Sequence, residues 1–240
     1  MITANQKKFV KSLAQKKFRI QHQCFVVEGV KLVDELLVSD FSIRSIYATS
    51  SWINDHPGVE AVPVTSKDLS IMSAFKSAHE VLAVVEFKSP KKPVTLQGVA
   101  LALDFIQDPG NLGTIIRTAD WFGMNTIYCS SDCVDLYNPK VIQATMGSIF
   151  RVQVLYGNLE ELLPQHKGAA IYGALLNGEN VYTQTLEKDH AILVMGNESK
   201  GISPKLMPFI THPVSIPGKG KAESLNVASA TAILCAEFAK

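Results

Sequence analysis

The chain has 240 residues, of which 47% are hydrophobic and 19% are charged, and its 23 basic residues almost balance its 22 acidic ones. This composition excludes an intrinsically disordered chain, and no apolar run approaches the roughly 18 residues that a membrane span needs. A chain of this length forms one large domain or two small ones. Residues 1–9 contain no apolar signal core, so we expect a cytoplasmic location.

The small net charge hides an uneven distribution. Residues 1–31 carry seven basic side chains and one acidic one, 7 − 1 = +6, which leaves +1 − 6 = −5 for the other 209 residues. Lys16, Lys17 and Arg19 lie within this basic segment. Charge alone favours a solvated helix face, but a local cluster of this kind can also contact the phosphates of a nucleic acid.

Residues 1–88 show the pattern of a small α/β module. Apolar spacing predicts helices over residues 5–16, 29–38 and 68–75, and strands over residues 45–48, 61–64 and 81–87. Two prolines interleaved with lysines then predict a linker over residues 89–95.

Residues 96–240 show longer apolar strands that alternate with helices. We predict strands at 99–105, 126–129, 151–154, 169–174, 191–195 and 212–215, and helices near 112–122, 139–146, 159–163 and 225–239. Near-continuous apolar strands with helical crossovers indicate a parallel sheet that is covered on both faces.

Several common classes of site are disfavoured. The four cysteines form no CxxC pair and the six histidines are scattered, so we expect free buried thiols and no metal. No G-x-G-x-x-G follows the strand at 99–105, and residues 218–223 lack the flanking residues of a Walker loop. The sequence therefore fits neither a dinucleotide-dependent dehydrogenase nor a P-loop NTPase.

Polar residues interrupt the apolar pattern after three predicted strands. Residues 108–119 contain Asn111 and Arg117, residues 195–202 contain Glu198, and residues 216–228 contain Asn226. Each of these residues has a simple structural explanation, as a helix cap, a turn residue or a surface residue. Ligands of open α/β sheets bind at the carboxyl ends of the strands, so three such segments together favour a site.

These segments also carry a resemblance to a known family. The order N-x-G-x-I-x-R-x-A (residues 111–119), G-N-E-x-x-G (196–201) and I-P…S-L-N-V (216–227) resembles the three motifs of the SpoU/TrmH family, in the SPOUT superfamily. These are S-adenosylmethionine-dependent RNA 2′-O-ribose methyltransferases. Lys16-Lys-x-Arg19, followed by Phe25-Val-Val-Glu-Gly29, resembles the RNA substrate-binding module that precedes many such catalytic domains.

The resemblance implies a fold and an assembly. It implies an RNA substrate-binding domain over residues 1–88, a linker over 89–95, and a Rossmann-like α/β catalytic domain with a deep trefoil knot over 96–240. The second and third motifs would form the knot and hold S-adenosylmethionine. The protein is expected to be a homodimer with its active site near the subunit interface, and the chemistry needs no metal.

The resemblance also implies roles for individual residues. Arg117 would lie closest to the ribose 2′-hydroxyl, and because a guanidinium keeps its proton below a pH of about 12, gripping a phosphate and stabilising the developing alkoxide suit it better than acting as a base. Asn111, Glu198 and Asn226 would orient Arg117, the loops or the RNA. The implied cofactor contacts are Ala174, Met195, Gly196, Ile216, Ser224 and Leu225, and the implied RNA contacts are Lys16, Lys17 and Arg19.

The resulting prediction is a 2′-O-methyltransferase that acts on ribosomal RNA. Four alternatives stay open at this point. The substrate could be transfer RNA, the modification could confer antibiotic resistance, the chain could be a non-catalytic RNA-binding or ribosome-assembly protein, or the methyl group could go to a small molecule.

Overall fold

The computed structural model describes residues 2–75, 79–88 and 96–240. The chain forms two compact units, one built from residues 1–89 and 135–150 and the other from residues 90–134 and 151–240. The predicted linker, residues 89–95, lies outside the described residues. Within the described part, no helix is both long enough and apolar enough to cross a membrane.

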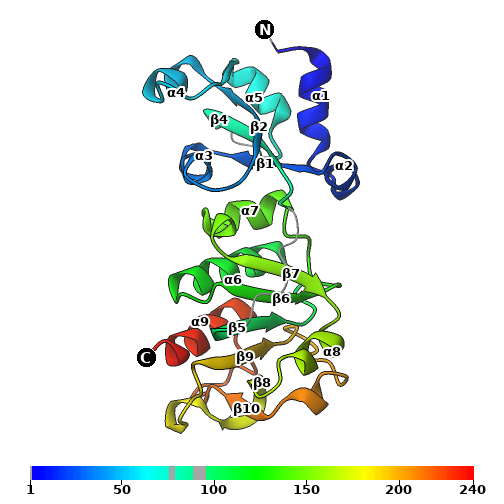
Figure 1. Ribbon diagram of the computed structural model, residues 1–240, viewed down its shortest axis with the longest axis vertical. Helices are drawn as coiled ribbons and strands as arrows, with labels where there is room; N and C mark the ends of the chain where they lie inside the picture. The colour runs from blue at the N-terminus through cyan, green and yellow to red at the C-terminus, as the bar shows by residue number, and fades with distance from the viewer. Residues whose placement is uncertain (1, 76–78, 89–95) are drawn as a thin grey trace. The chain divides into compact units, whose positions relative to one another are not determined.

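The first unit is a four-stranded mixed sheet with helices around it (Figure 1). The sheet has the order β1-β4-β2-β3, in which β4 runs antiparallel to β1 and β2, and β3 runs parallel to β2. In chain order its elements are α1 (Ala4–Ser12), α2 (Lys16–His22), β1 (Cys24–Glu28), α3 (Val30–Leu37), β2 (Ile43–Ala48), α4 (Ser50–Asp55), β3 (Val62–Pro63), α5 (Ser66–Met72) and β4 (Val81–Glu86).

The predicted helices and strands of residues 1–88 are confirmed, with one change at the start. The single helix predicted over residues 5–16 is two helices, because α1 ends at Ser12 and α2 begins at Lys16. The structure adds β1 and α4, which the apolar spacing did not predict.

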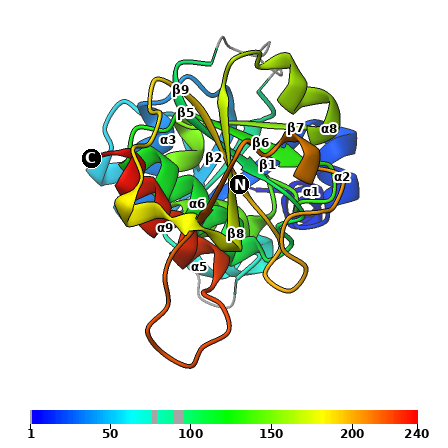
Figure 2. The same ribbon diagram turned by 90° about the horizontal axis from the view of Figure 1, so that it is seen from below.

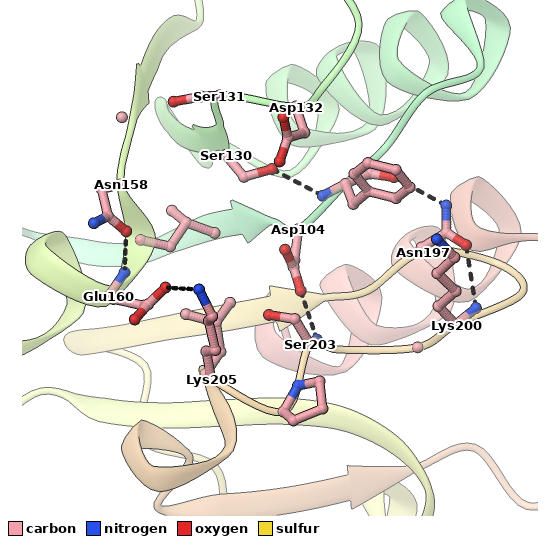
Figure 3. Close-up of a pocket in the computed structure, with 16 residues that line it drawn as sticks. Asp104, Ser130, Ser131, Asp132, Asn158, Glu160, Asn197, Lys200, Ser203 and Lys205 are labelled. Atoms are coloured by element: carbon pink, nitrogen blue, oxygen red, sulfur yellow. Dashed lines mark hydrogen bonds and ion pairs between the residues drawn. The ribbon is translucent and has the colours of Figure 1, made fainter.

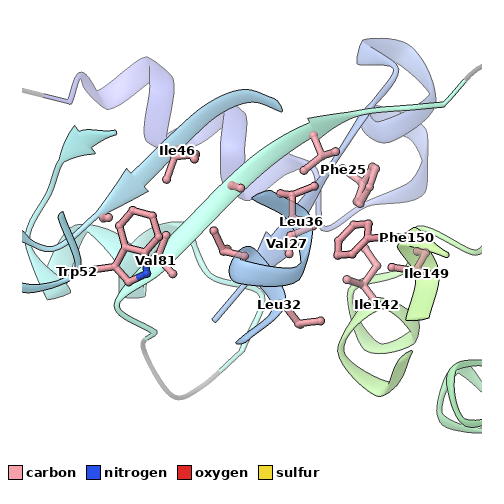
Figure 4. Close-up of a cluster of buried hydrophobic side chains, with 14 residues drawn as sticks. Phe25, Val27, Leu32, Leu36, Ile46, Trp52, Val81, Ile142, Ile149 and Phe150 are labelled. Carbon is pink, nitrogen blue, oxygen red and sulfur yellow. The ribbon is translucent and has the colours of Figure 1, made fainter. Parts of the chain in front are cut away.

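A segment from the second half of the sequence completes the core of the first unit. Helix α7 (Pro139–Thr145) and the short helix η1 (Ser148–Phe150) contribute Ile142, Ile149 and Phe150 to a cluster that includes Phe25 of β1 (Figure 4). The ring of Tyr137 stacks on Phe25 at a centroid distance of 4.4 Å. The predicted helix at 139–146 therefore exists, but it packs within the first unit instead of covering the parallel sheet.

Arg19 has a structural position in this unit, which corrects its predicted role as an RNA contact. Its side chain is buried, and one guanidinium nitrogen donates to the carbonyls of Leu13 and Ala14, both at 2.8 Å. Another nitrogen pairs with Asp135 at 2.5 Å. With these donors turned inward, Arg19 cannot reach a phosphate on the surface.

Replacing Arg19 with alanine is therefore expected to destabilise the first unit. It leaves the Asp135 carboxylate and two carbonyls without their partner, and breaking a buried ion pair costs about 3 kcal/mol or more. Urea unfolding of the variant, followed by the fluorescence of buried Trp52, measures this loss. Lys16→Ala on the same helix removes an exposed charge and serves as the control. Equal unfolding midpoints for the two variants would contradict the assignment.

The second unit is a parallel six-stranded sheet of order β10-β8-β9-β5-β6-β7 (Figures 1 and 2). All six predicted strands are confirmed, as are the helices predicted near 112–122, 159–163 and 225–239. In chain order its elements are β5 (Gly98–Leu103), α6 (Pro109–Trp121), β6 (Thr126–Ser130), β7 (Gln153–Gly157), α8 (Leu159–Leu162), η2 (Leu163–Gln165), β8 (Ala170–Asn180), η3 (Val181–Thr183), β9 (His190–Met195), η4 (Met207–Phe209), β10 (His212–Ser215) and α9 (Val227–Phe238).

Both faces of the parallel sheet are covered, as predicted. Residues 191–195 of β9 are all buried, although successive side chains of a strand point to opposite faces. On one face Ile192 and Val194 pack in a cluster that includes Leu159 and Leu163 of the α8–η2 segment.

The strand order creates a switch point between β5 and β9. The chain runs from β5 to β6 and β7 on one side, and β9 pairs with β5 on the other. Leu103 at the end of β5 lies opposite Met195 at the end of β9, so the loops beginning at Asp104 and Gly196 start side by side. In open α/β sheets this is the usual place for a ligand.

Candidate active site

Three of the four predicted catalytic residues form one hydrogen-bonded chain. Asn226 Nδ2 donates to Asn111 Oδ1 at 3.0 Å, and Asn111 Nδ2 donates to the Glu198 carboxylate. Asn111 lies in the first turn of α6, Glu198 in the loop after β9, and Asn226 at the N-terminus of α9. Segments up to 115 residues apart in sequence therefore meet at one edge of the sheet.

The helix cap fixes the direction of this chain. Asn226 Oδ1 accepts the backbone N–H groups of Ala228 and Ser229, so only its amide nitrogen remains for Asn111. Asn111 must then present its oxygen to Asn226 and its nitrogen to Glu198. The structural role of Asn226 as a cap thus orients the carboxylate of Glu198.

A tight loop holds Glu198 in place. Asn197 Oδ1 accepts the N–H groups of Ser199 and Lys200, and the backbones of Asn197 and Gly201 pair across the loop. Gly196 makes this closure possible, because a Cβ there would lie 2.2 Å from the carbonyl carbon of Gly201. Gly196 of the second motif is therefore explained by packing, and Gly201 by its left-handed backbone, with φ of +68°.

The structure does not bring Arg117 into this chain. Arg117 is exposed on α6, six residues after Asn111, which is about 9 Å along the helix and about 120° around it. It has no hydrogen bond or ion pair with another described residue, so its guanidinium is available to a ligand.

Four of the predicted cofactor residues lie on the adjacent strands β8, β9 and β10 or directly after them. Gly173 of β8 pairs with Val194 of β9, so Ala174 follows beside Met195 and Gly196. Between the β10 residues Pro213 and Val214 the pairing jumps from Gly173 to Glu179, so residues 174–178 form an irregular stretch within β8, next to the strand that leads to Ile216. Ser224 and Leu225 are exposed and directly precede Asn226.

This edge suits an adenosyl cofactor. It offers backbone groups at strand ends together with apolar side chains in solvent, since Leu176 is 83% exposed and Leu225 is 48% exposed. The side chain of Met195 is buried and its carbonyl accepts the N–H of Asp104, so any contact with Met195 is through its backbone. Large exposed apolar side chains near polar backbone groups are typical of a binding site for an aromatic base.

A pocket of about 400 Å³ opens on the other side of the Glu198 loop (Figure 3). It lies at the carboxyl ends of β5, β6 and β7, and no pattern in the sequence predicted it. The only signal was the polar Asp104 at the end of an apolar strand. Its lining includes Asp104, Phe105, Ser130, Asp132, Asn158, Glu160, Lys200 and Lys205.

The thiols next to this pocket are free, as predicted. The hydrogen bond from Cys129 lowers the pKa of Cys133 to about 7, with Ser130 and the backbone N–H groups of Phe105 and Ile106 acting in the same direction. The same contact, with burial, raises the pKa of Cys129. Among the described residues, no group of three or more His, Cys, Asp or Glu side chains could hold a metal ion.

Comparison with known proteins decides the family. The sequence model of the SpoU rRNA Methylase family matches residues 98–236, more than half of the chain. The chain belongs to this family. The model of an MRM3-like substrate binding domain matches residues 5–83. Both parts of the resemblance seen in the sequence are therefore confirmed.

Individual relatives agree over almost the whole length. The 23S rRNA (guanosine(2553)-2′-O)-methyltransferase RlmP of Bacillus subtilis is 31% identical, with 93% of this chain and 92% of that protein covered. A putative RNA methyltransferase of the TrmH family from Porphyromonas gingivalis is 40% identical, with a TM-score of 0.91 and coverage of 99% and 98%. An AdoMet-bound rRNA methyltransferase from Sinorhizobium meliloti is 29% identical, with a TM-score of 0.88 and coverage of 99% and 95%.

Proposed function

We propose that this protein transfers a methyl group from S-adenosylmethionine to a ribose 2′-hydroxyl of ribosomal RNA. The observation that carries the proposal is the chain of hydrogen bonds from Asn226 through Asn111 to Glu198, because it assembles all three motifs at one edge of the sheet. Two relatives support the class of reaction. The Bacillus relative is named as a 2′-O-methyltransferase of 23S rRNA, and the Sinorhizobium relative is an rRNA methyltransferase with AdoMet bound.

The residues of this chain divide the work as follows. Bound S-adenosylmethionine supplies a methyl group that is open to attack by a nucleophile. Arg117 holds a phosphate of the RNA and stabilises the negative charge that develops on the 2′-oxygen. Glu198, held by Asn111 through one carboxylate oxygen, keeps the other oxygen to accept a hydrogen bond from the hydroxyl and so align it.

A deletion experiment tests the activity in cells. Ribose methylation is mapped across total RNA from cells with and without this gene. We expect one 2′-O-methyl mark in ribosomal RNA to disappear and to return with the wild-type gene but not with Arg117→Ala. Calorimetry with S-adenosylmethionine distinguishes the enzyme from a non-catalytic RNA-binding protein. No measurable binding of the cofactor would exclude the methyltransferase.

We propose that two copies form a homodimer through the exposed side of α6 and α9. Trp121 at the end of α6 is 84% exposed, and α6 packs against α9. On α9 the residues outside the core are also mostly small or apolar, including Ala230, Ala232 and Ile233. A helix that is apolar all round is normally buried, which a second copy would achieve.

Trp121→Ser is therefore expected to weaken the dimer. Losing a large aromatic anchor from the centre of an interface costs about 2 kcal/mol or more, or roughly thirtyfold in the dissociation constant. Light scattering after size exclusion at low micromolar concentration measures the mass. Val38→Ser, which changes an equally exposed side chain of the first unit, should leave a dimer. A wild-type mass of one chain would overturn this proposal.

We further propose that the first unit binds the RNA and that the second contains the trefoil knot. The MRM3-like match and the exposure of Lys16 and Lys17 support the first proposal. The close backbone approach of Gly178 to Val214, and of Gly196 to residues 201 and 202, supports the second, since a chain that passes through a loop needs room at its crossings.

Reversing the charges of Lys16 and Lys17 to glutamate tests the RNA-binding unit. Each lost phosphate contact should lower the slope of log K against log salt by about 0.7 to 0.9, so binding weakens and becomes less salt-dependent. Filter binding of ribosomal RNA at several salt concentrations measures the slope. Affinity for S-adenosylmethionine should not change. An unaltered slope would show that these lysines do not contact RNA phosphates and are only part of a solvated helix face.

A further inference from the structure

The pocket beside Glu198 is separate from the residues predicted to bind the cofactor. None of those six residues lines it, because they lie on β8, at the ends of β9 and β10 or directly before α9, while the pocket extends toward β6 and β7. Both places flank the switch point between β5 and β9. The sheet therefore offers two ligand positions, and the proposed cofactor takes only one of them.

Phe105 gives this pocket an aromatic surface in a fixed position. Its backbone is left-handed, with φ of +61°, which a bulky residue adopts only under constraint. Two contacts supply the constraint: its N–H donates to Ser130 Oγ at 2.9 Å, and its carbonyl accepts Asn197 Nδ2 at 3.0 Å. Residues with strained backbones are found preferentially at ligand sites, where the precise position of the side chain compensates for the energetic cost of the strain.

The polar lining favours a neutral group with N–H donors inside the pocket. The lining carries two ammonium groups, of Lys200 and Lys205, and three carboxylates, of Asp104, Asp132 and Glu160, which gives 2 − 3 = −1. Asp104 is only 7% exposed and uses Oδ2 to accept the N–H of Ser203 at 2.6 Å, so Oδ1 remains for a ligand. Carboxylates next to an aromatic ring suit a base that carries an exocyclic amine, and they disfavour a phosphate.

The lysines suit the phosphate of the same nucleotide at the pocket mouth. Both are exposed, Lys200 Nζ lies 5.0 Å from the centre of the Phe105 ring, and Lys205 has a loose contact of 3.7 Å with Glu160. A volume of about 400 Å³ is at the lower end for small-ligand sites, which fits one nucleotide.

We propose that this pocket binds one unstacked base of the substrate RNA, with Phe105 as the stacking surface, Asp104 as a hydrogen-bond acceptor, and Lys200 and Lys205 on the adjoining phosphate. The inference rests on the proposed function and specifies how that site recognises RNA. Asn197, Glu198 and Lys200 share one short loop, so a base held in this pocket positions its strand against Glu198. Single-stranded RNA is commonly recognised by stacking on an aromatic side chain.

Methyl transfer to ribosomal RNA from cells that lack the gene tests the proposal, together with calorimetry of S-adenosylmethionine. We expect Phe105→Leu, which retains apolar bulk, to lower kcat/KM for RNA about tenfold or more, because a stacked base is lost. Lys200→Ala should lower the salt slope of RNA binding by nearly one. Asp104→Asn, which can still accept from Ser203, should also lower kcat/KM. Cofactor affinity should stay at the wild-type value in all three variants.

The outcomes separate this proposal from the proposed function. An inactive wild-type protein that binds no S-adenosylmethionine would refute the proposed function itself. An active wild type whose RNA kinetics are unchanged by Phe105→Leu and Lys200→Ala would overturn the pocket alone. A loss of cofactor affinity in these variants would likewise overturn it, by making the pocket part of the cofactor site. Lys167→Ala, at an exposed lysine away from the pocket, is the matched control for charge.

Discussion

Arg117→Ala is expected to lower kcat for RNA methylation by about 10²- to 10³-fold, while S-adenosylmethionine still binds with wild-type affinity. The size follows from the loss of one group that stabilises the negative charge developing on the 2′-oxygen. The side chain is exposed on α6 and has no partner among the described residues, so its removal leaves the packing intact. Single-turnover methylation with labelled cofactor measures the rate, and calorimetry measures the affinity.

Two further variants define the role of Arg117. Thr114→Ala removes an exposed side chain one turn earlier on the same helix and should leave kcat unchanged. Arg117→Lys keeps the charge but loses the fork of donors, so partial activity without a new ionisation below about pH 9 is expected from electrostatic stabilisation. A rate that instead rises along a new titration curve in the lysine variant would identify a proton-accepting role. Full activity of Arg117→Ala would remove this residue from the mechanism.

Much of the second unit could be predicted from the sequence because its central strands β5, β6 and β9 are largely buried on both faces. Such strands appear as continuous apolar runs, and five of the six predicted strands agree with the structure to within three residues, while β8 continues six residues beyond its predicted end. The strand ends also carried the polar residues of the site, so Asn111, Glu198 and Asn226 could be singled out before their contacts were known. Local patterns suffice where burial dictates the residue type.

Long-range contacts explain what could not be predicted. Arg19 and Lys16 look alike in sequence, but Asp135 lies 116 residues from Arg19 and turns it inward. In the same way, nothing in residues 139–146 shows that their apolar side packs against Phe25 of the first unit. The left-handed backbone of Phe105 is also invisible in sequence, because Ser130 and Asn197 impose it from other loops. For this reason the pocket that Phe105 lines could not be predicted from the sequence.

Gly196→Ala is expected to destabilise the second unit by about 3 kcal/mol and to abolish binding of S-adenosylmethionine. A Cβ at this position would lie 2.2 Å from the carbonyl carbon of Gly201 and from the nitrogen of Ile202. Both are backbone atoms, so they cannot rotate away as a side chain would, and the loop that carries Glu198 must open. Because Glu198 is held by Asn111 from α6, this opening also breaks the chain of hydrogen bonds to Asn226.

Thermal unfolding and calorimetry measure the two effects of Gly196→Ala. For a chain of this size, 3 kcal/mol corresponds to a fall of roughly 6 to 12 °C in Tm. Gly218→Ala is the matched control for stability, since a Cβ there meets no atom within 4 Å. Equal melting temperatures for the two variants would show that residues 196–202 can accommodate a Cβ at Gly196. The close packing of this loop would then not be what holds Glu198 in position. A stable Gly196→Ala protein that still bound the cofactor would also separate the second motif from the cofactor site.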